Sequence, residues 1–501
     1  MSKKRKAPID IPSADFKKFG YELVDQVASL LETIDKYPVS TSKTPGEIRE
    51  TLNSNASLPE KGGNPGEILN RATRLLFENS LYNGHPKFWG YITSSAAPIG
   101  ILGEFLAAAV NPNLGGWQLS PMATEIEAQT VRWIAELIDY PSDCGGVLVS
   151  GGNMANFVCF LAARVQAGGE AIRSVGLRKM ANSPFRVYAS NETHTWIQKA
   201  TDLFGLGTDA IRWIKCDSDQ RIDMEELRET VALDVKNGIT PMMVVGTAGT
   251  VSTGAVDPLY EMAEFCREER IWFHVDGAYG GLAAAVPGLD KDLYGLKLAD
   301  SIAVDPHKWL YAPLEAGCVL VRDGEHLRRA FSYHPPYYHF GEEAINYVDY
   351  GMQNSRGFRA LKIWLALQQV GREGYRQMIS DDIRLAKAMH EALAKRSEIE
   401  SLTCELSIAT FRYVPLDLKE SANDPKAAEY LDQLNEEILV RLKTSGETFI
   451  SNAVLHDRFV LRACIVNFRT SDEDVEVLPE IIVKYGKKID SEMRKEAFSR
   501  A

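Results

Sequence analysis

The sequence predicts an α/β fold built around a mostly parallel central sheet. Between residues 146 and 322, short apolar runs alternate with stretches of helical periodicity. Strands that are apolar throughout, rather than alternately polar, are typical of a parallel sheet covered by helices on both faces. The pattern changes after about Arg372, where a long helix leads into shorter mixed segments. We therefore expect a large α/β domain followed by a small α+β C-terminal domain.

The expected elements follow this alternation. The strands of the large domain are expected at Gly146–Ser150, Arg186–Ser190, Ile211–Cys216, Met242–Thr247, Ile271–Asp276, Asp300–Asp305 and Cys318–Arg322. Its helices are expected at Pro121–Tyr140, Met154–Ala167, Thr195–Phe204, Met224–Asn237 and Leu259–Glu269. The small domain is expected to contain a helix at Tyr375–Ala394, strands near Ile408–Tyr413, Thr448–Ile450 and Phe459–Ile465, and a last helix.

The N-terminal region precedes this alternation. Apolar residues recur at helical spacing over residues 11–36, which predicts an amphipathic helix. Residues 40–65 are rich in Pro, Gly, Ser and Thr and are expected to form an extended connection to a helix at residues 65–79. The predicted organisation is an N-terminal helical and extended segment (1–95), a large domain (96–375) and a C-terminal domain (376–501).

Composition excludes several classes of protein. The chain has 501 residues, a formal net charge of −12 and a pI of about 5.4, which argues against nucleic acid as its main partner. No apolar run reaches the roughly 18 residues of a membrane span. The seven cysteines are scattered and form no CxxC pair, so we expect no disulfide framework, no metal site and a cytoplasmic location.

Two strand ends hold charged residues where solvated surface charge is not expected. The run Ser301–Val304 leads into Asp305-Pro306-His307-Lys308-Trp309, and the run before it ends as His274-Val275-Asp276-Gly277-Ala278. In a parallel α/β sheet, ligands bind beyond the carboxyl ends of the strands. A lysine can hold pyridoxal phosphate as a Schiff base, and an acid can pair with its pyridinium nitrogen. Lys308 and Asp276 therefore point to this cofactor.

A third strand end supplies a loop suited to a phosphate group. Ser150-Gly151-Gly152-Asn153-Met154-Ala155-Asn156 links a strand to a helix. Small residues let backbone N–H groups approach an anion, and the N-terminus of a helix favours negative charge. We predict Gly152 and Asn153 as phosphate contacts, with His307 as a further contact.

With these motifs in the same order, the chain resembles the group II pyridoxal-phosphate-dependent amino-acid decarboxylases from about His85 to Arg469. Its pattern is most similar to that of the aromatic-L-amino-acid decarboxylases. The resemblance implies the fold of the aspartate-aminotransferase type (fold type I). It also implies a homodimer in which the N-terminal segment contacts the partner.

The resemblance also implies roles for single residues. Lys308 would hold the cofactor and Asp276 its ring nitrogen, while Ala278 and His194 would pack on opposite faces of the ring. Thr250 would reach the phenolic oxygen of the ring. Val251 departs from the Thr-Thr doublet of many relatives.

The segment from Phe331 to His339 resembles a loop that closes over the active site in this family. Tyr337 matches the tyrosine that returns a proton to the substrate after CO2 leaves, and Tyr333 and Tyr338 are close competitors. Relatives with phenylalanine at this place tend to be aldehyde synthases, so Tyr337 favours simple decarboxylation.

Five residues match positions of the family's substrate pocket: Tyr91, Ile92 and Ser94 from the same subunit, and Asn113 and Gly115 from the partner. Gly115 stands where aromatic relatives often have a bulky ring, which suggests a roomier pocket. The expected substrate is an aromatic L-amino acid. The alternatives are a glutamate or other polar amino-acid decarboxylase, an aldehyde synthase, a carbon–carbon lyase and a non-catalytic cofactor-binding relative.

Overall fold

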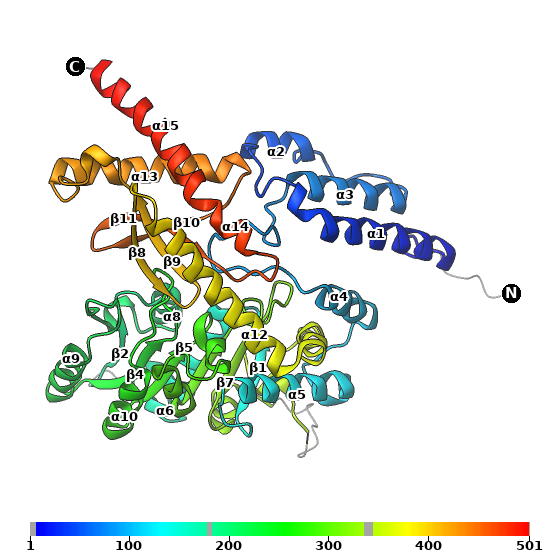
Figure 1. The fold of residues 1–501 in the computed structure, drawn as a ribbon. Coiled ribbons are helices and arrows are strands. Elements are labelled where there is room, and N and C mark those ends of the chain that lie inside the picture. Colours follow the sequence, from blue (N-terminus) through cyan, green and yellow to red (C-terminus); the bar gives the residue numbers. More distant parts are fainter. Residues whose placement is uncertain (1–6, 178–182, 335–343, 500–501) are drawn as a thin grey trace.

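The computed structural model describes residues 7–177, 183–334 and 344–499 of the chain. A large domain surrounds a central sheet, the C-terminal domain packs on one side of it, and the N-terminal helices project from the body (Figure 1). The predicted α/β fold with a mostly parallel central sheet and a small α+β C-terminal domain is confirmed.

The central sheet has seven strands in the order β1-β7-β6-β5-β4-β2-β3. They are β1 (Gly145–Val149), β2 (Phe185–Ser190), β3 (Ile211–Ile214), β4 (Thr240–Thr247), β5 (Trp272–Asp276), β6 (Ser301–Val304) and β7 (Gly317–Val321). Strands β3, β2, β4, β5 and β6 are parallel, and β7 is antiparallel to both β6 and β1. All of these strands except β7 therefore end at the same edge of the sheet.

Helices cover both faces of the sheet. The helices of the large domain are α4 (Pro98–Val110), α5 (Pro121–Leu137), α6 (Gly152–Gly168), α7 (Ile172–Val175), α8 (Trp196–Leu203), α9 (Met224–Lys236), α10 (Leu259–Glu269), α11 (Glu325–Phe331) and α12 (Ala360–Ala394). Successive strand residues point to opposite faces, so Cys318 and Leu320 join the core with α5 and α10, whereas Val319 and Val321 join the core with α6 and α8.

The C-terminal domain contains a sheet in the order β10-β11-β9-β8. Its elements are β8 (Ile399–Glu405), β9 (Ile408–Tyr413), α13 (Pro425–Ser445), β10 (Ser451–Leu455), β11 (Arg458–Cys464), α14 (Asp472–Glu476) and α15 (Leu478–Ser499). The strand expected at Thr448–Ile450 is wrong, because the paired strand begins at Ser451. The long helix α12 enters this domain after a break at Gly371, where φ is +67°.

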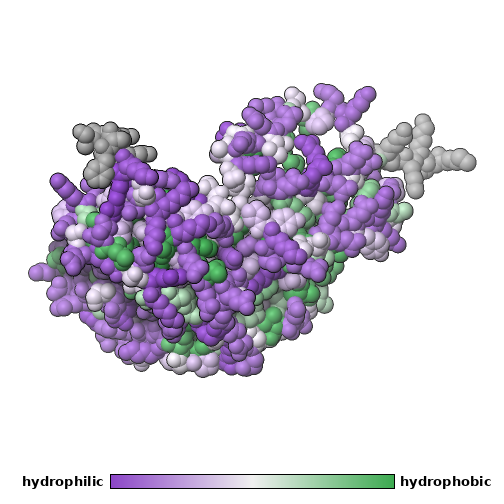
Figure 2. Space-filling view, turned by 45° about the horizontal axis from the view of Figure 1, so that its top comes forward, coloured by the Kyte–Doolittle hydropathy of each residue, from purple (hydrophilic) through white to green (hydrophobic). Residues whose placement is uncertain are grey.

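The N-terminal segment consists of α1 (Ser13–Thr33), α2 (Pro45–Leu52) and α3 (Pro65–Asn79). The prediction of an extended connection over residues 40–65 is wrong in part, because helix α2 lies within that stretch. Its start is a capping box in which Thr44 accepts from the Glu47 N–H and Glu47 accepts from the Thr44 N–H. On the face shown in Figure 2, hydrophilic side chains predominate. Within the described ranges, no helix is long and apolar enough to cross a membrane.

Candidate active site

Most of the predicted cofactor residues lie at one edge of the central sheet. The Ser150–Asn156 loop follows β1, His194 follows β2, Asp276 ends β5, and Lys308 follows β6. Strands β5 and β6 are neighbours, so the lysine segment and the aspartate come from adjacent strand ends. The topology thus brings motifs that lie more than 100 residues apart to the edge where α/β sheets bind ligands.

Asp276 is a buried carboxylate held by three donors. Its Oδ2 accepts hydrogen bonds from Trp196 Nε1 at 2.8 Å and Asn156 Nδ2 at 3.3 Å, and its Oδ1 accepts from the backbone N–H of Ala278 at 3.2 Å. Sequence reasoning assigned no role to Trp196 or Asn156, although Trp196 lies two residues after His194. These three donors fix the orientation of the carboxylate, which suits an acid paired with a pyridinium.

Lys308 lies beside an aspartate of its own segment. Its Nζ is 3.0 Å from Asp305 Oδ2, and the other oxygen, Asp305 Oδ1, has no hydrogen-bond partner among the described residues. Asp305 also lies 3.6 Å from His307 Nε2. Asp305 therefore lies between the lysine and the imidazole at this corner of the site.

The segment after Lys308 is fixed from helix α12. Asp382 on α12 accepts hydrogen bonds from Trp309 Nε1 at 2.9 Å and from the Tyr311 hydroxyl at 2.6 Å. Burial raises the pKa of Asp382 to about 7, although both donors favour the carboxylate. Trp309 also stacks on Tyr279, with ring centroids 4.7 Å apart. These contacts hold the Lys308 backbone in a defined position.

The glycine loop approaches the lysine segment closely. Gly151 has φ of +99°, and α6 begins at Gly152. A Cβ on Gly152 would lie 2.9 Å from Asp305 Oδ2 and 3.2 Å from the Cβ of Ala278. Glycine is therefore required at a helix N-terminus that faces the lysine segment, and Asn153 follows in the first turn. The lysine, the buried acid and this cradle together fit pyridoxal phosphate.

His194 is solvent-exposed at the start of α8. Its Nδ1 accepts from the Trp196 N–H at 3.3 Å. Desolvation lowers the pKa of His194, the charge of Asp276 raises it, and Lys308 lowers it again. The ring thus lies within the electrostatic field of both predicted cofactor residues.

Thr250 lies in the loop after β4 and is fully buried. Its hydroxyl is 2.9 Å from that of Thr253, within a turn that has positive φ at Gly249 and Gly254. The buried Asp257 fixes the same loop by accepting from the Thr247 N–H at 2.7 Å. A contact between Thr250 and the cofactor stays a prediction.

Three of the predicted substrate residues lie near the lysine segment or its approach. Ser94 donates to the carbonyl of His307 at 2.7 Å, which ties this stretch to the residue before Lys308. Ile92 packs against the core of the large domain. Tyr91 is 54% exposed, has φ of +53°, and lies with its ring 5.9 Å from that of Phe449.

Arg462 on β11 is a candidate residue that sequence reasoning missed. It is 2% exposed and donates through Nη1 to the carbonyl of Tyr91 at 3.1 Å and to Ser451 Oγ at 3.0 Å. Its Nε and Nη2 have no hydrogen-bond partner among the described residues. A buried guanidinium with unpaired N–H groups is chemically suited to a carboxylate. Only the fold brings it to Tyr91, because the two residues are 371 positions apart.

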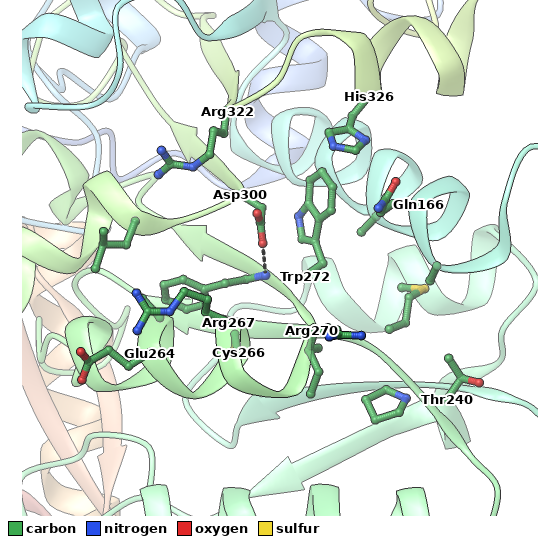
Figure 3. Close-up of a pocket in the computed structure, with 18 of the residues that line it drawn as sticks. Gln166, Thr240, Glu264, Cys266, Arg267, Arg270, Trp272, Asp300, Arg322 and His326 are labelled. Carbon is green, nitrogen blue, oxygen red and sulfur yellow. Dashed lines mark hydrogen bonds between the residues drawn. The ribbon is translucent and has the colours of Figure 1, made fainter.

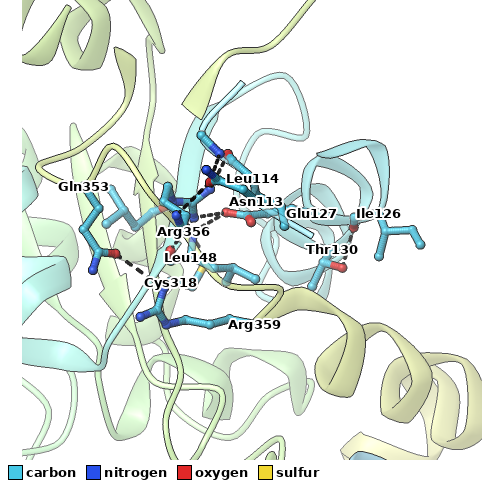
Figure 4. A network of polar contacts seen from close by, with 12 residues as sticks. Asn113, Leu114, Ile126, Glu127, Thr130, Leu148, Cys318, Gln353, Arg356 and Arg359 are labelled. Atoms are coloured by element: carbon cyan, nitrogen blue, oxygen red, sulfur yellow. Dashed lines mark hydrogen bonds and ion pairs between the residues drawn. The ribbon is translucent and has the colours of Figure 1, made fainter. Parts of the chain in front are cut away.

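Asn113 lies on a buried polar network (Figure 4), and Gly115 joins this network through its backbone N–H. Asn113 Oδ1 accepts from the backbone N–H groups of Gly115 at 3.0 Å and Arg356 at 3.1 Å. A side chain on Gly115 would collide with the carbonyl oxygen of Asn354 in the same chain. Backbone packing therefore explains this glycine without reference to the size of a substrate pocket.

The network is anchored by an ion pair between Arg356 and Glu127. Their side chains are 2% and 0% exposed, and Arg356 Nη2 also donates to the Leu148 carbonyl at 2.6 Å. Glu127 Oε1 in turn accepts from the Leu148 N–H at 2.9 Å. The pair thus connects the Asn113 segment to strand β1.

We expect Arg356→Ala to lower the free energy of unfolding by about 3–5 kcal/mol, because it leaves the Glu127 carboxylate buried without its partner. Denaturation in urea measures this change. Arg359→Ala is the matched control. Arg359 pairs with the half-exposed Glu315, and its loss is expected to cost about 1 kcal/mol or less. Equal stability losses in the two variants would contradict the assignment of Arg356 as the anchor.

Tyr337 lies outside the described residues, as does its competitor Tyr338. The third candidate, Tyr333, is 70% exposed, and the guanidinium of Arg173 lies 4.1 Å above its ring. The assignment of Tyr337 as proton donor therefore stays a prediction.

A cavity of about 950 Å³ lies at the opposite edge of the sheet (Figure 3). Thr240 and Trp272 line it at the starts of β4 and β5, and Arg267 and Arg270 line it at the end of α10. Cations at the C-terminus of a helix complement its partial negative charge. The cavity is separate from the residues described above, so we assign it no part in the candidate site.

Comparisons with known proteins identify the family of the chain. The model of the pyridoxal-dependent decarboxylase conserved domain matches residues 45–414. An aromatic-L-amino-acid decarboxylase of Bacillus atrophaeus is 30% identical over 472 residues, 93% of this chain and 94% of that protein. A phenylacetaldehyde synthase of Arabidopsis thaliana is 30% identical and covers 95% and 96% of the two chains. The crystal structure of Oryza sativa TDC with PLP and tryptamine has a TM-score of 0.88 at 26% identity, over 97% of this chain and 100% of that one.

Proposed function

Because the chain belongs to the family of pyridoxal-dependent decarboxylases and is a carboxy-lyase that uses pyridoxal phosphate, we propose that it converts an aromatic L-amino acid into the amine and CO2. The observation that carries this proposal is the pair of strand ends holding Lys308 and the buried Asp276 beside the glycine cradle. Relatives named as aromatic-amino-acid and tyrosine decarboxylases support the substrate class.

In this proposal each residue of the site has one task. Lys308 holds the cofactor covalently, and Asp276 holds a proton on its ring nitrogen. His194 and Ala278 pack on opposite faces of the ring. When bound, pyridoxal phosphate accepts the electron pair that remains as the bond between Cα and the carboxylate breaks. Its phosphate would be held by Gly152, Asn153 and His307, and its phenolic oxygen by Thr250.

The substrate side is assigned to Tyr91, Ile92 and Ser94, and Arg462 can orient a substrate carboxylate through its unpaired N–H groups. Tyr337 donates a proton to Cα after CO2 leaves and regains one from solvent. This step balances the reaction, since the lost carboxylate is replaced by a hydrogen. A closed loop around Tyr337 would exclude water from the reacting carbon.

We propose a homodimer in which Asn113 and Gly115 serve the site of the second copy. Four large apolar side chains of α4 are more than half exposed, which suits a protein interface. They are Leu102, Phe105, Leu106 and Val110. The seven cysteines are free, so a cytoplasmic location stays our expectation from cysteine usage.

The function is tested by CO2 release from a panel of common L-amino acids in the presence of pyridoxal phosphate, with amine and aldehyde measured in each reaction. We expect CO2 and an equal amount of amine from tryptophan, tyrosine or phenylalanine. Release from glutamate alone would overturn the aromatic assignment and leave the chemistry intact. No release from any amino acid would overturn the proposed reaction.

Aldehyde synthesis is the second candidate, because phenylacetaldehyde synthases are among the similar proteins. The role of Tyr337 distinguishes aldehyde synthesis from decarboxylation to the amine. We expect Tyr337→Phe to lower amine formation about 100-fold, as expected for loss of a general acid, and to shift product towards aldehyde. Product analysis by chromatography measures both.

Tyr333→Phe is the matched control for this variant, because Tyr333 is exposed and stacks under Arg173. It is expected to keep the amine as product. An unchanged amine yield in Tyr337→Phe, or a loss confined to Tyr333→Phe, would remove Tyr337 from its proposed role.

A further inference from the structure

Strand β5 holds three polar side chains on one face. Trp272, His274 and Asp276 alternate along the strand, so all three point towards helix α6. Ser301 on the neighbouring strand β6 lies in register with His274. Asn156 comes from the second turn of α6. These five side chains form a line from the start of β5 to the carboxylate at its end.

The line is continuous in hydrogen bonds. Trp272 Nε1 donates to Ser301 Oγ at 2.8 Å, and Ser301 Oγ is 2.9 Å from His274 Nδ1. His274 Nε2 is 2.8 Å from Asn156 Oδ1, and Asn156 Nδ2 donates to Asp276 Oδ2 at 3.3 Å. Each of these residues is buried, with at most 7% of its surface exposed.

The groups at the two ends of this line decide which residue donates and which accepts in each of its hydrogen bonds. An indole N–H is only a donor, so Ser301 Oγ accepts from Trp272, and its own hydroxyl proton is available to His274 Nδ1. At the other end the Asp276 carboxylate only accepts, so Asn156 turns its Nδ2 towards Asp276 and its Oδ1 towards His274 Nε2. The Nε2 of a neutral His274 then holds the ring proton and donates to Asn156 Oδ1. The reverse order would turn Asn156 Oδ1 towards the Asp276 carboxylate and place two acceptors against each other.

The surroundings of His274 keep its ring neutral. Burial lowers the pKa of His274 to about 4, and the charge of Asp276 opposes this only in part. The other titratable neighbour, Cys159 on α6, is buried, which raises its pKa to about 12. Trp196 packs edge-on against the imidazole at 5.6 Å and donates to the same Asp276 oxygen. His274 therefore adds no positive charge to this line of side chains at neutral pH.

We propose that His274 and Asn156 are positioning residues which, through this one-way chain of donors, hold the Asp276 carboxylate charged and aimed at the ring nitrogen of the cofactor. The inference rests on the proposed role of Asp276. Chains of hydrogen bonds that point the same way polarise one another, so the effect on the last acceptor exceeds that of one amide. Breaking the chain should change the protonation of the ring nitrogen without touching the substrate.

The test reads that proton directly in the holoenzyme. The protein is loaded with pyridoxal phosphate labelled with 15N in the ring, and solid-state NMR reports whether the nitrogen is protonated. We expect a protonated nitrogen in the wild type and loss of much of that signal in Asn156→Leu and His274→Phe. His274→Gln, whose amide can still donate to Asn156, should restore most of it.

His326→Gln is the matched control. His326 packs edge-on against Trp272 at 5.1 Å, as Figure 3 also shows, and forms no hydrogen bond with the chain of donors. It should keep the wild-type signal. A protonated nitrogen in both Asn156→Leu and His274→Phe would overturn the inference.

Two further measurements separate the possible failures. Asp276→Asn should remove the protonated signal, and a signal that persists there would sink the proposed role of Asp276 itself rather than the chain alone. The second measurement uses wild-type holoenzyme with 15N-labelled histidine at pH 7. The spectrum should contain the signal of a neutral histidine with its proton on Nε2, and this signal should be absent from the spectrum of His274→Gln. If His274 has its proton on Nδ1, or is charged, the inference is overturned even if the variants fail to fold.

Discussion

Replacing Lys308 with alanine is expected to abolish CO2 release from every amino acid and to leave the protein folded. The side chain is 17% exposed and pairs with Asp305, so its loss removes one ion pair at the rim of the core. CO2 release and the visible absorbance of added cofactor measure the effect together.

Lys297→Ala is the control for this variant. Lys297 lines the cavity at the opposite edge of the sheet and is about half exposed, with Asp139 at 3.8 Å. We expect wild-type turnover and absorbance from it. Turnover at the wild-type rate in Lys308→Ala would remove Lys308 as the residue that holds the cofactor.

Asp276→Asn is expected to lower kcat about 100-fold or more, the effect typical of removing a group that stabilises charge at the reaction centre. The substitution keeps the shape of the side chain, so packing against Trp196 is retained. The amide cannot supply the negative charge that holds a proton on the ring nitrogen. Steady-state kinetics on the preferred amino acid measure the change.

A half-buried aspartate just before a strand serves as its control. Asp300 precedes β6 and accepts from the Phe273 N–H at 2.8 Å at the other edge of the sheet. Asp300→Asn keeps an accepting oxygen there, and we expect activity close to that of the wild type. If both variants lose activity equally, the loss in Asp276→Asn reflects general damage to the sheet.

Much of the fold follows from local sequence pattern. The strands of the large domain are short and apolar throughout, so their periodicity predicts them to within a few residues, and α10 has the predicted bounds. Strand β8 was not predicted, because most of its residues are half-buried and give no clean alternation. Helix α2 was hidden by the Pro and Gly around it, although Thr44 and Glu47 form a capping box.

Some residues of the candidate site can likewise be predicted from local sequence, and others cannot. Motifs at strand ends predict Lys308 and Asp276, because a charge after a buried strand is visible in the sequence alone. The contact of Arg462 with Tyr91 depends on the packing of the C-terminal domain against the approach to the site, and no local pattern encodes it. The collision that forces glycine at position 115 comes from a backbone segment more than 200 residues away.

The proposed active site depends most on where the cofactor is attached. The direct measurement is reduction of the holoenzyme with borohydride, followed by proteolysis and mass spectrometry of the labelled peptides. We predict one pyridoxyl group per chain, on Lys308. A label on another lysine, or active enzyme without any label, would contradict the assignment of this strand edge as the active site.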